Sequence, residues 1–133
     1  MSRYLALYLT TLVVLMVLDY LFLGVLAKGF FVSEVGDMLA EVKPVPAVLF
    51  YLIYVVGVLI FVSGGVAANW QRTMIYGALF GLFCYATFDL TCLALLKHWS
   101  WAVAALDVTW GAVVTAVSST AGLLVANWFV PRV

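Results

Sequence analysis

The sequence predicts an all-α, polytopic membrane protein, built as a bundle of four transmembrane helices. Of its 133 residues, 68% are hydrophobic and 9% are charged, whereas soluble domains carry about 25% charged residues. The apolar residues form four stretches, and each is long enough to cross a bilayer, which takes about 20 residues. We therefore expect a single transmembrane domain over residues 1–133, with spans at about 4–27, 45–68, 74–96 and 101–129.

Composition also excludes several classes of function. The formal net charge is zero, so nothing in the composition indicates a nucleic-acid partner. Cys84 and Cys92 are eight residues apart on one predicted helix, which is too far for a disulfide and does not match a metal-ligand spacing. We interpret both cysteines as small apolar packing residues, and we expect no metal and no cofactor. The first apolar run is too long for a signal peptide and contains Asp19.

The segments between the spans predict how the helices are arranged. The second span begins at Pro44 and Pro46, where the missing N–H groups of proline cost least. The turns at 69–73 and 97–100 are short, so we expect the helices that they join to be antiparallel. Tryptophans fall near the ends of the spans, as an interfacial belt requires: Trp70, Trp99, Trp101 and Trp128.

The first loop predicts a short amphipathic helix on the membrane surface at about 33–42. Apolar residues recur there at helical spacing, and Ser33 is the expected N-cap; the apolar positions are Val35, Met38, Leu39 and Val42. Two roles stay open for this helix. It acts as a lid over the bundle, or it is a connector that covers helix ends.

Three aspartates lie inside the predicted spans. A carboxylate at a helix centre costs about 2.5–3.5 kcal/mol to insert, and no Lys or Arg shares those stretches. Asp19 and Asp89 each precede the end of an apolar run by seven residues, and Asp107 follows Ser100 by seven. In an alternating topology these three ends share one side of the bilayer. At 1.5 Å per residue, all three carboxyl groups are expected about 10 Å below one interface.

Other polar and aromatic groups lie at a matching depth. Tyr51 and Tyr54 belong to the second span, which has no acid, and Tyr85 precedes Asp89 by four residues. We therefore expect four helices to converge on one polar pocket under an aromatic rim. The candidate ligand-binding or proton-binding residues are Asp19, Asp89, Asp107, Tyr51, Tyr54, Tyr85, Thr91 and Trp110.

The chemistry of such a cluster favours protons or cations. Carboxylates that are both buried and close together repel, so they titrate as one set and at least one is expected to be protonated. The group then stores a proton, binds a cation or acts as an acid–base pair. A structural alternative also exists, in which the acids are hydrogen-bonded ties between helices. Such ties contribute only about 0.6 kcal/mol each in membranes.

Two further features of the sequence have a structural interpretation as well as a functional one. Gly77-x-x-x-Gly81 permits close helix contact, which serves a homodimer or packing within one chain. His98 lies in a short turn. It is interpreted more simply as a loop histidine at the membrane interface than as a metal ligand or a proton shuttle.

Four motifs give the chain a resemblance to a known family. They are Leu18-Asp19-Tyr20-Leu21-Phe22-Leu23-Gly24, Phe50-Tyr51-Leu52-Ile53-Tyr54-Val55-Val56-Gly57, Tyr85-Ala86-Thr87-Phe88-Asp89-Leu90-Thr91 and Asp107-Val108-Thr109-Trp110-Gly111. Over essentially its whole length the chain resembles domain-of-unknown-function family 2177, small bacterial predicted membrane proteins without an assigned activity. Cys92 stands where the family pattern has Asn, and Phe22 where it has Trp. The resemblance implies the fold and the motif residues, not a mechanism.

Three functions remain open from the sequence. The first is binding or proton-coupled translocation of a small cationic or amphipathic ligand, for which four-helix proteins of this size usually form homodimers. The second is an intramembrane enzyme acting on a lipid or isoprenoid, with one Asp as acid and another as base. The third is an accessory subunit of a larger membrane complex. Membrane lipids are expected partners in every case.

The orientation follows from weak charge signals. Arg3, Arg72 and Arg132 are on one side, and Lys28, Lys43 and Lys97 are on the other, so the positive-inside count is a tie. An uncleaved short N-terminus with Arg3 usually stays inside. We therefore expect a bacterial inner-membrane protein with both termini in the cytoplasm and the aspartates near the outer face.

Reporter fusions test this orientation. Green fluorescent protein fused to either terminus is expected to fluoresce, and alkaline phosphatase at the same positions is expected to be inactive. A fusion after Lys97 serves as the control and is expected to give the reverse pattern. Active phosphatase at the termini would invert the topology.

Overall fold

The chain folds into an all-α bundle, as its sequence predicts. The computed structural model describes residues 2–26, 28–36, 44–65 and 69–129, and the described part contains helices and no strand. Four helical segments are long and apolar enough to cross a membrane: Ser2–Leu26, Val45–Ser63, Trp70–Leu95 and Trp101–Phe129. The fold class of a polytopic membrane bundle is therefore confirmed.

Two of the four spans end in a π-helix. Helix α1 (Ser2–Leu21) continues into the π-helix η1 (Phe22–Leu26), and α3 (Pro44–Val58) continues into η3 (Leu59–Ser63). The wider turn of η3 ends where the Gly64 N–H donates to the Leu59 carbonyl over 2.8 Å. Single π turns are rare and recur at functional sites. The turn in η1 is notable because it begins three residues after Asp19.

The other two spans begin at capped ends. Helix α4 (Trp70–Leu95) starts before the predicted 74–96, because the Asn69 side chain accepts a hydrogen bond from the Arg72 N–H at 2.8 Å. Residues 70–73, expected in a turn, therefore form the first turn of α4. Helix α5 (Trp101–Phe129) is preceded by Ser100, whose hydroxyl accepts a hydrogen bond from the Val103 N–H at 3.1 Å. Caps of this kind supply partners for the N–H groups of a first turn.

The helix between the first two spans differs from the predicted one. Helix α2 runs over Lys28–Val35, so it begins before the expected 33–42. Ser33 is not its N-cap. It lies inside the helix, and its hydroxyl donates to the Phe30 carbonyl at 2.8 Å. The rest of the predicted surface helix, at 37–43, lies outside the described residues.

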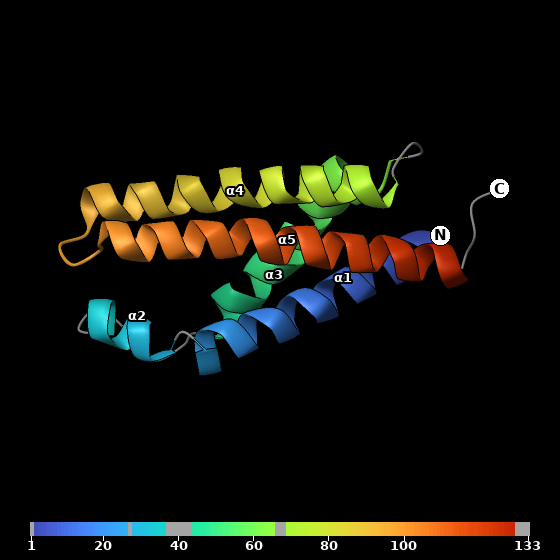
Figure 1. Cartoon of the computed structure of the whole chain (residues 1–133). Helices are drawn as coiled ribbons and strands as arrows, with labels where there is room; N and C mark the ends of the chain where they lie inside the picture. The colour runs from blue at the N-terminus through green and yellow to red at the C-terminus, as the bar shows by residue number, and fades with distance from the viewer. Residues whose placement is uncertain (1, 27, 37–43, 66–68, 130–133) are drawn as a thin grey trace.

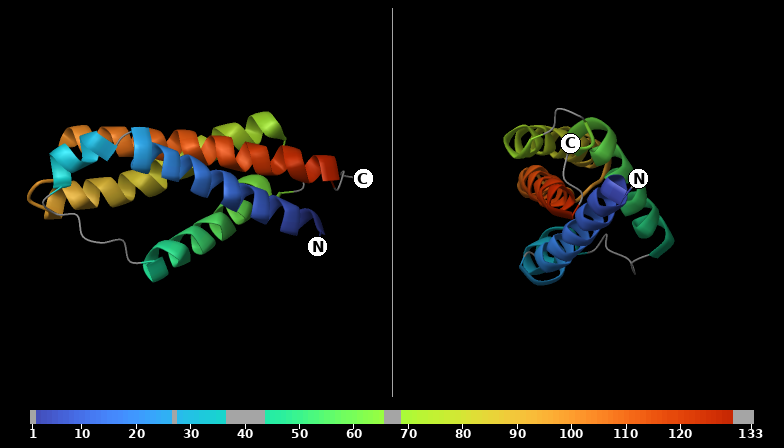
Figure 2. Two further views of the ribbon diagram at one scale, coloured as in Figure 1. Left: turned by 90° about the horizontal axis from the view of Figure 1, so that it is seen from below. Right: turned by 90° about the vertical axis from the view of Figure 1, so that its right-hand side faces the viewer.

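The helices are arranged around α5 (Figure 1). Helices α4 and α5 run side by side, and α1 packs against the other flank of α5. Helix α2 lies at the end of the bundle where α4 and α5 are joined, and the start of α1 lies at the opposite end with the end of α5 (Figures 1 and 2). Helix α3 crosses the others at an angle, and its first turns stand away from α4 and α5 (Figure 2).

Small residues bring α4 and α5 together. A Cβ at Gly77 would meet the Ser119 hydroxyl at 2.5 Å, and a Cβ at Gly81 would collide with the Gly111 carbonyl. Gly122 is equally tight against Thr11 of α1. In a bilayer the lipid tails are as apolar as the helix surfaces, so no hydrophobic driving force brings helices together. Close packing of the backbones, as seen here, drives their association instead. The Gly77-x-x-x-Gly81 spacing therefore serves packing within the chain.

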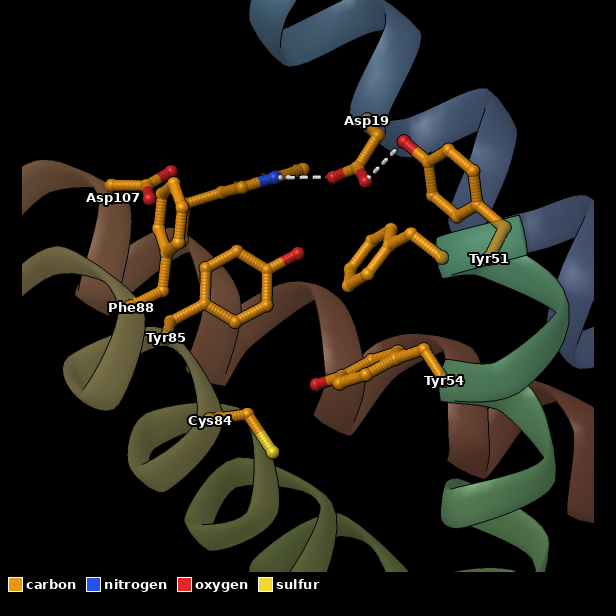
Figure 3. Close-up of a pocket in the computed structure, with 9 residues that line it drawn as sticks. Asp19, Tyr51, Tyr54, Cys84, Tyr85, Phe88 and Asp107 are labelled. Atoms are coloured by element: carbon orange, nitrogen blue, oxygen red, sulfur yellow. Dashed lines mark hydrogen bonds between the residues drawn. The ribbon is translucent and has the colours of Figure 1, made fainter. Parts of the chain in front are cut away.

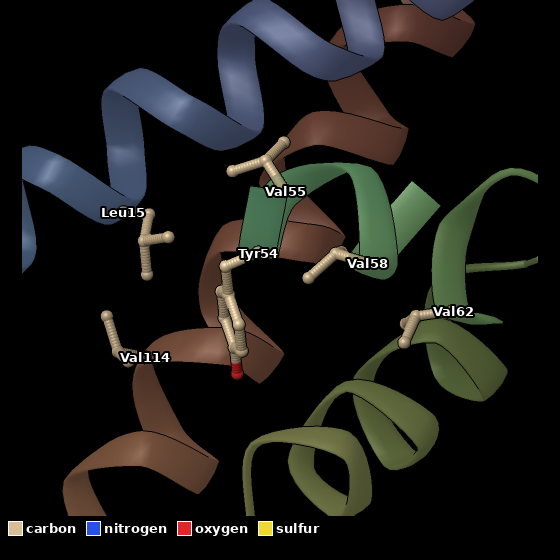
Figure 4. Packing of buried hydrophobic residues seen from close by; sticks show 6 residues of the cluster. All are labelled: Leu15, Tyr54, Val55, Val58, Val62 and Val114. Carbon is tan, nitrogen blue, oxygen red and sulfur yellow. The ribbon is translucent and has the colours of Figure 1, made fainter. Parts of the chain in front are cut away.

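A hydrophobic cluster fills the middle of the bundle (Figure 4). It joins α1, α3, η3 and α5 through these buried residues: Leu15, Tyr54, Val55, Val58, Val62 and Val114. A second cluster of Leu7, Leu123 and Ala126 joins the far ends of α1 and α5. Outside these clusters, most apolar side chains face outward, as a lipid-exposed surface requires. Exposed Trp70, Trp101 and Trp128 mark the ends of the spans.

The contact at Gly81 makes a direct prediction about stability. Gly81→Ala is expected to destabilise the protein by about 1–3 kcal/mol, because the added methyl group meets the backbone of α5 and neither helix can yield cheaply. The measurement is unfolding in mixed micelles. Gly29→Ala in α2 is the matched control, since its Cβ meets nothing within 4 Å. Equal stability of the two variants would contradict the α4–α5 contact.

Candidate functional site

A cavity of about 350 Å³ lies between the four spans, at the level where the sequence predicts the aspartates. Each span contributes to its wall, and the side chains point toward one another (Figure 3). The wall consists of two acids, six aromatic rings and one thiol: Asp19, Phe50, Tyr51, Tyr54, Cys84, Tyr85, Phe88, Asp107 and Trp110. No basic side chain is among these lining residues.

Asp19 is held by one donor from each of two other helices. Tyr51 on α3 donates its hydroxyl to Oδ2 at 2.7 Å, and the Trp110 indole on α5 donates to Oδ1 at 2.8 Å (Figure 3). Phe22, the first residue of η1, stacks on Trp110 with centroids 4.3 Å apart and planes at 7°. Two donors and one stacked ring fix both the carboxyl group and its neighbours, so Asp19 has a defined orientation in the wall.

Helix α3 is tied to the rest of the bundle by Tyr54. Its hydroxyl shares a hydrogen bond of 2.7 Å with the Thr115 hydroxyl on α5. Its ring lies 5.4 Å from that of Phe80 and 6.2 Å from that of Tyr85, both on α4, measured between centroids. Phe50, one turn earlier, stacks on the Tyr54 ring at 5.3 Å. These aromatic contacts span the distance between α3 and the α4–α5 pair.

The α4 wall depends on a glycine opposite it. A Cβ at Gly111 would collide with the Tyr85 ring, so the ring fits only because α5 has no side chain there. Cys84 and Phe88 lie on the same face of α4, one position before Tyr85 and three after it. Tyr85 is thereby positioned against α5, with its hydroxyl directed into the cavity (Figure 3).

The two remaining aspartates face each other between α4 and α5. Asp107 lines the cavity, whereas Asp89 lies behind it, and their carboxyl groups are within interaction range of each other. Asp89 is 0% exposed and Asp19 is 4% exposed. Neither carboxyl oxygen of Asp89 has a well-formed hydrogen bond within the described part of the chain. Asp107 also lies within electrostatic range of Asp19, so it stands between the other two.

The structure brings most of the predicted residues together. Six of them line the cavity: Asp19, Tyr51, Tyr54, Tyr85, Asp107 and Trp110. Asp89 is not among the lining residues but lies within interaction range of Asp107, which is. Thr91 is not brought to it. Its hydroxyl is exposed and donates to the Thr87 carbonyl of its own helix at 2.6 Å, which is the usual alternative for a threonine in a helix.

Three lining residues were not among the predicted ones. Cys84 is predicted from the sequence as a packing residue, and Phe50 and Phe88 belong to the family motifs but not to the predicted site residues. A signal existed for all three. Cys84 and Phe88 follow Gly81 by three and seven residues, and Phe50 precedes Tyr54 by four, so helical spacing alone puts them on the pocket face.

The lining defines what chemistry the cavity supports. Two carboxyl groups offer negative charge or exchangeable protons, and aromatic faces attract cations through their quadrupoles. Among the described residues, no group of three or more His, Cys, Asp and Glu side chains is arranged to hold a metal ion. The described lining thus combines groups that can exchange protons or meet a positive charge with faces that can contact apolar groups.

Comparison with known proteins identifies a family. A family model described as "Predicted membrane protein (DUF2177)" matches residues 4–124. No curated protein and no solved structure matches the chain.

The Tyr51–Asp19 bond predicts a measurable coupling. In a double-mutant cycle, Tyr51→Phe and Asp19→Asn are expected to couple by about 0.6–1.7 kcal/mol of unfolding free energy, the range of interhelical hydrogen bonds in membranes. The cycle is measured in mixed micelles. Tyr20→Phe is the matched control, because Tyr20 is 71% exposed beside Asp19, and its coupling with Asp19→Asn is expected to be zero. Equal coupling for the two tyrosines would refute the bond.

Proposed function

Because the chain belongs to the DUF2177 family of predicted membrane proteins, a description that names no reaction, we propose its function from the cavity. The protein binds a small cationic or amphipathic ligand between its four spans. It either only binds this ligand or carries it across the membrane in a step coupled to protons. We place it in the bacterial inner membrane with both termini in the cytoplasm, which puts the cavity near the outer face.

The observation that carries the proposal is an unbalanced charge. Asp19 and Asp107 line one apolar cavity, and among the residues that the structure describes no Lys, Arg or His lines it with them. A buried carboxylate without a countercharge costs several kcal/mol, so it must take up a proton or meet a cation. A ligand with a positive end supplies the missing charge.

The aromatic wall supports the same ligand class. Six rings surround the two acids, and a desolvated cation over an aromatic face gains about 2 kcal/mol. Rings also accept the apolar part of an amphipathic molecule. An anion would meet repulsion from both carboxylates and from the ring faces.

The edges of the cavity indicate a route from the lipid. Phe50 on α3 and Phe88 on α4 line the cavity and are 45% and 56% exposed. Both therefore reach the outer surface of the bundle. Figure 2 shows that the first turns of α3, the helix that carries Phe50, stand away from α4. An amphipathic ligand dissolved in the bilayer meets the cavity at this aromatic edge.

The same edge favours one alternative. A lipid-modifying or isoprenoid-modifying enzyme needs a pocket that opens sideways and a pair of acids, and Asp89 and Asp107 are such a pair. Incubation with labelled membrane lipids distinguishes the two, since only an enzyme alters them. The third alternative, an accessory subunit, requires acids that face partner helices. Burial of Asp19 and Asp89 inside the chain gives it no support.

Ligand binding is tested with benzyltrimethylammonium, a permanent cation with an aromatic ring. Titration calorimetry on protein in lipid nanodiscs is expected to show saturable binding. Asp107→Asn is expected to weaken it about tenfold, which corresponds to about 1.4 kcal/mol. The control is Glu34→Gln, a charge-neutralising change in α2 away from the cavity lining, with affinity expected to be unchanged. Equal affinities in the two variants would remove the pocket as the binding site.

The two cysteines of the chain give an independent test of the place of binding. Cys84 lines the cavity, and Cys92 does not. The probe cation is expected to slow modification of Cys84 by a small membrane-permeant thiol reagent, measured by mass spectrometry, and to leave the rate at Cys92 unchanged. Protection of neither thiol, or of both equally, would place the cation elsewhere.

A further inference from the structure

Asp89 has no part in the proposed ligand contacts, yet it is the most deeply buried acid of the described chain. Its side chain is 0% exposed, and both of its oxygens lack a hydrogen-bond partner among the described residues. Leaving a charged group buried and unsatisfied is among the most expensive states in a protein. The surroundings of Asp89 must therefore supply a proton or a cation.

We propose that Asp89 and Asp107 hold one proton in common behind the pocket, and that a cation entering the pocket displaces it. The second half of this inference, the displacement of the proton by a cation, rests on the proposed function. The first half, the shared proton, stands on the geometry of the two acids alone.

The geometry of the pair favours a proton over any other occupant. The two carboxyl groups come from adjacent helices and are within interaction range of each other. One proton between two facing carboxyl groups removes a like-charge repulsion and gives both groups a hydrogen bond. A metal ion would need more ligands, and the described residues offer no cluster of three.

Among the described residues, the neighbours of the pair include no cation that could replace the proton. The titratable groups within range of the pair are acidic or neutral: Asp19 on α1, and Tyr85 and Cys92 on α4. From α3, Tyr51 and Tyr54 line the cavity together with Asp107. Lys97 and His98 lie in the turn between α4 and α5 and are exposed. Protein side chains within the described part of the chain thus leave the charge of the pair unbalanced.

The position of Asp107 links the proton to the ligand. Asp107 belongs both to the pair and to the lining of the cavity, together with Asp19. A positive charge placed between Asp19 and Asp107 favours the ionised form of the pair, so the O–H bond breaks and the proton leaves to solvent. One positive charge enters as one leaves, and the net charge of the site is unchanged.

Trp99 offers Asp89 a partner once the proton has left. Its side chain lies next to Asp89, and its indole N–H is buried without a hydrogen-bond partner in the described part of the chain. Trp99 also packs edge-on against Phe88, with centroids 6.0 Å apart. An N–H donor beside a newly ionised carboxylate stabilises it. Trp99 is therefore a positioning residue for the exchange.

The shared proton is tested without any ligand. Infrared spectra of the protein in lipid at neutral pH are expected to contain the carbonyl band of a protonated carboxyl group. The band is expected to be lost in both Asp89→Asn and Asp107→Asn, and kept in Glu34→Gln. Circular dichroism confirms that each variant is folded. Absence of the band from the unaltered protein, or its persistence in Asp89→Asn, would overturn the shared proton.

The displacement is tested with benzyltrimethylammonium, which carries no exchangeable proton. Calorimetry in buffers of different ionisation enthalpy is expected to show release of about one proton per bound cation. Asp89→Asn is expected to abolish the release, whatever its affinity, because the amide of the new side chain donates to an already ionised Asp107. Trp99→Phe is expected to reduce it.

The outcomes separate the two proposals. Binding without proton release overturns the displacement and leaves the proposed function standing. No binding, with the infrared band present, overturns the proposed function and the displacement but retains the shared proton. Release that is undiminished in Asp89→Asn assigns the proton to another group and overturns the inference.

Discussion

The close contact between α4 and α5 determines where the functional groups stand. Four positions spaced by four residues along α4 meet four positions spaced by four along α5, in antiparallel order. Gly77 lies against Ser119, Gly81 against Thr115, Tyr85 against Gly111 and Asp89 against Asp107. The first two pairs are possible only because glycine lets the backbones approach. Since the helices are rigid, the same register that seats the glycines also brings the two acids face to face.

The cavity exists because a narrow interface adjoins a wide one. Glycines set the distance between α4 and α5, whereas large rings set the distance from that pair to α3. Tyr54 reaches across this wider space to Thr115, Phe80 and Tyr85, and Phe50 stacks behind it. A hydrophobic cluster closes the space farther along the bundle at Val58 and Val62. What remains open is the part beside Asp19 and Asp107, where each wall residue that the structure describes is acidic, aromatic or a thiol.

Hydropathy and helical spacing determine much of this arrangement from the sequence. Four apolar stretches give the four spans, and the depth of each acid follows from its distance to a span end. What they do not give is helix rotation, which depends on contacts between helices. Asp89 and Asp107 were both expected in the pocket, yet the register turns Asp89 behind it. The four-residue series 77, 81, 85, 89 and 107, 111, 115, 119 is visible in the sequence, but only the alignment of the two series identifies Thr115 and Ser119 as partners.

Other differences have local causes. Asn69 caps α4 and extends it over polar residues that hydropathy assigns to a turn. The Thr91 hydroxyl donates a hydrogen bond within its own helix, so its donor is satisfied without a contact to the cavity. Cys84 looked like a packing residue because a thiol in an apolar run has no chemical signature of its own. Its role in the wall depends on α3 being held away from α4, which no property of the α4 sequence reveals.

The depth of the acids has an electrical consequence. Asp19 precedes the end of its span, Leu26, by seven residues, or about 10 Å of helix, in a hydrocarbon layer about 30 Å thick. A charge that enters from the nearer face therefore crosses about one third of the membrane potential. At about 2.3 kcal/mol for a full crossing at 100 mV, this amounts to about 0.8 kcal/mol, or about fourfold in occupancy. A displaced proton that leaves by the same face cancels this effect, because the exchange then moves no net charge. The membrane potential therefore determines the occupancy of a cation in the cavity only where the proton leaves by the opposite face.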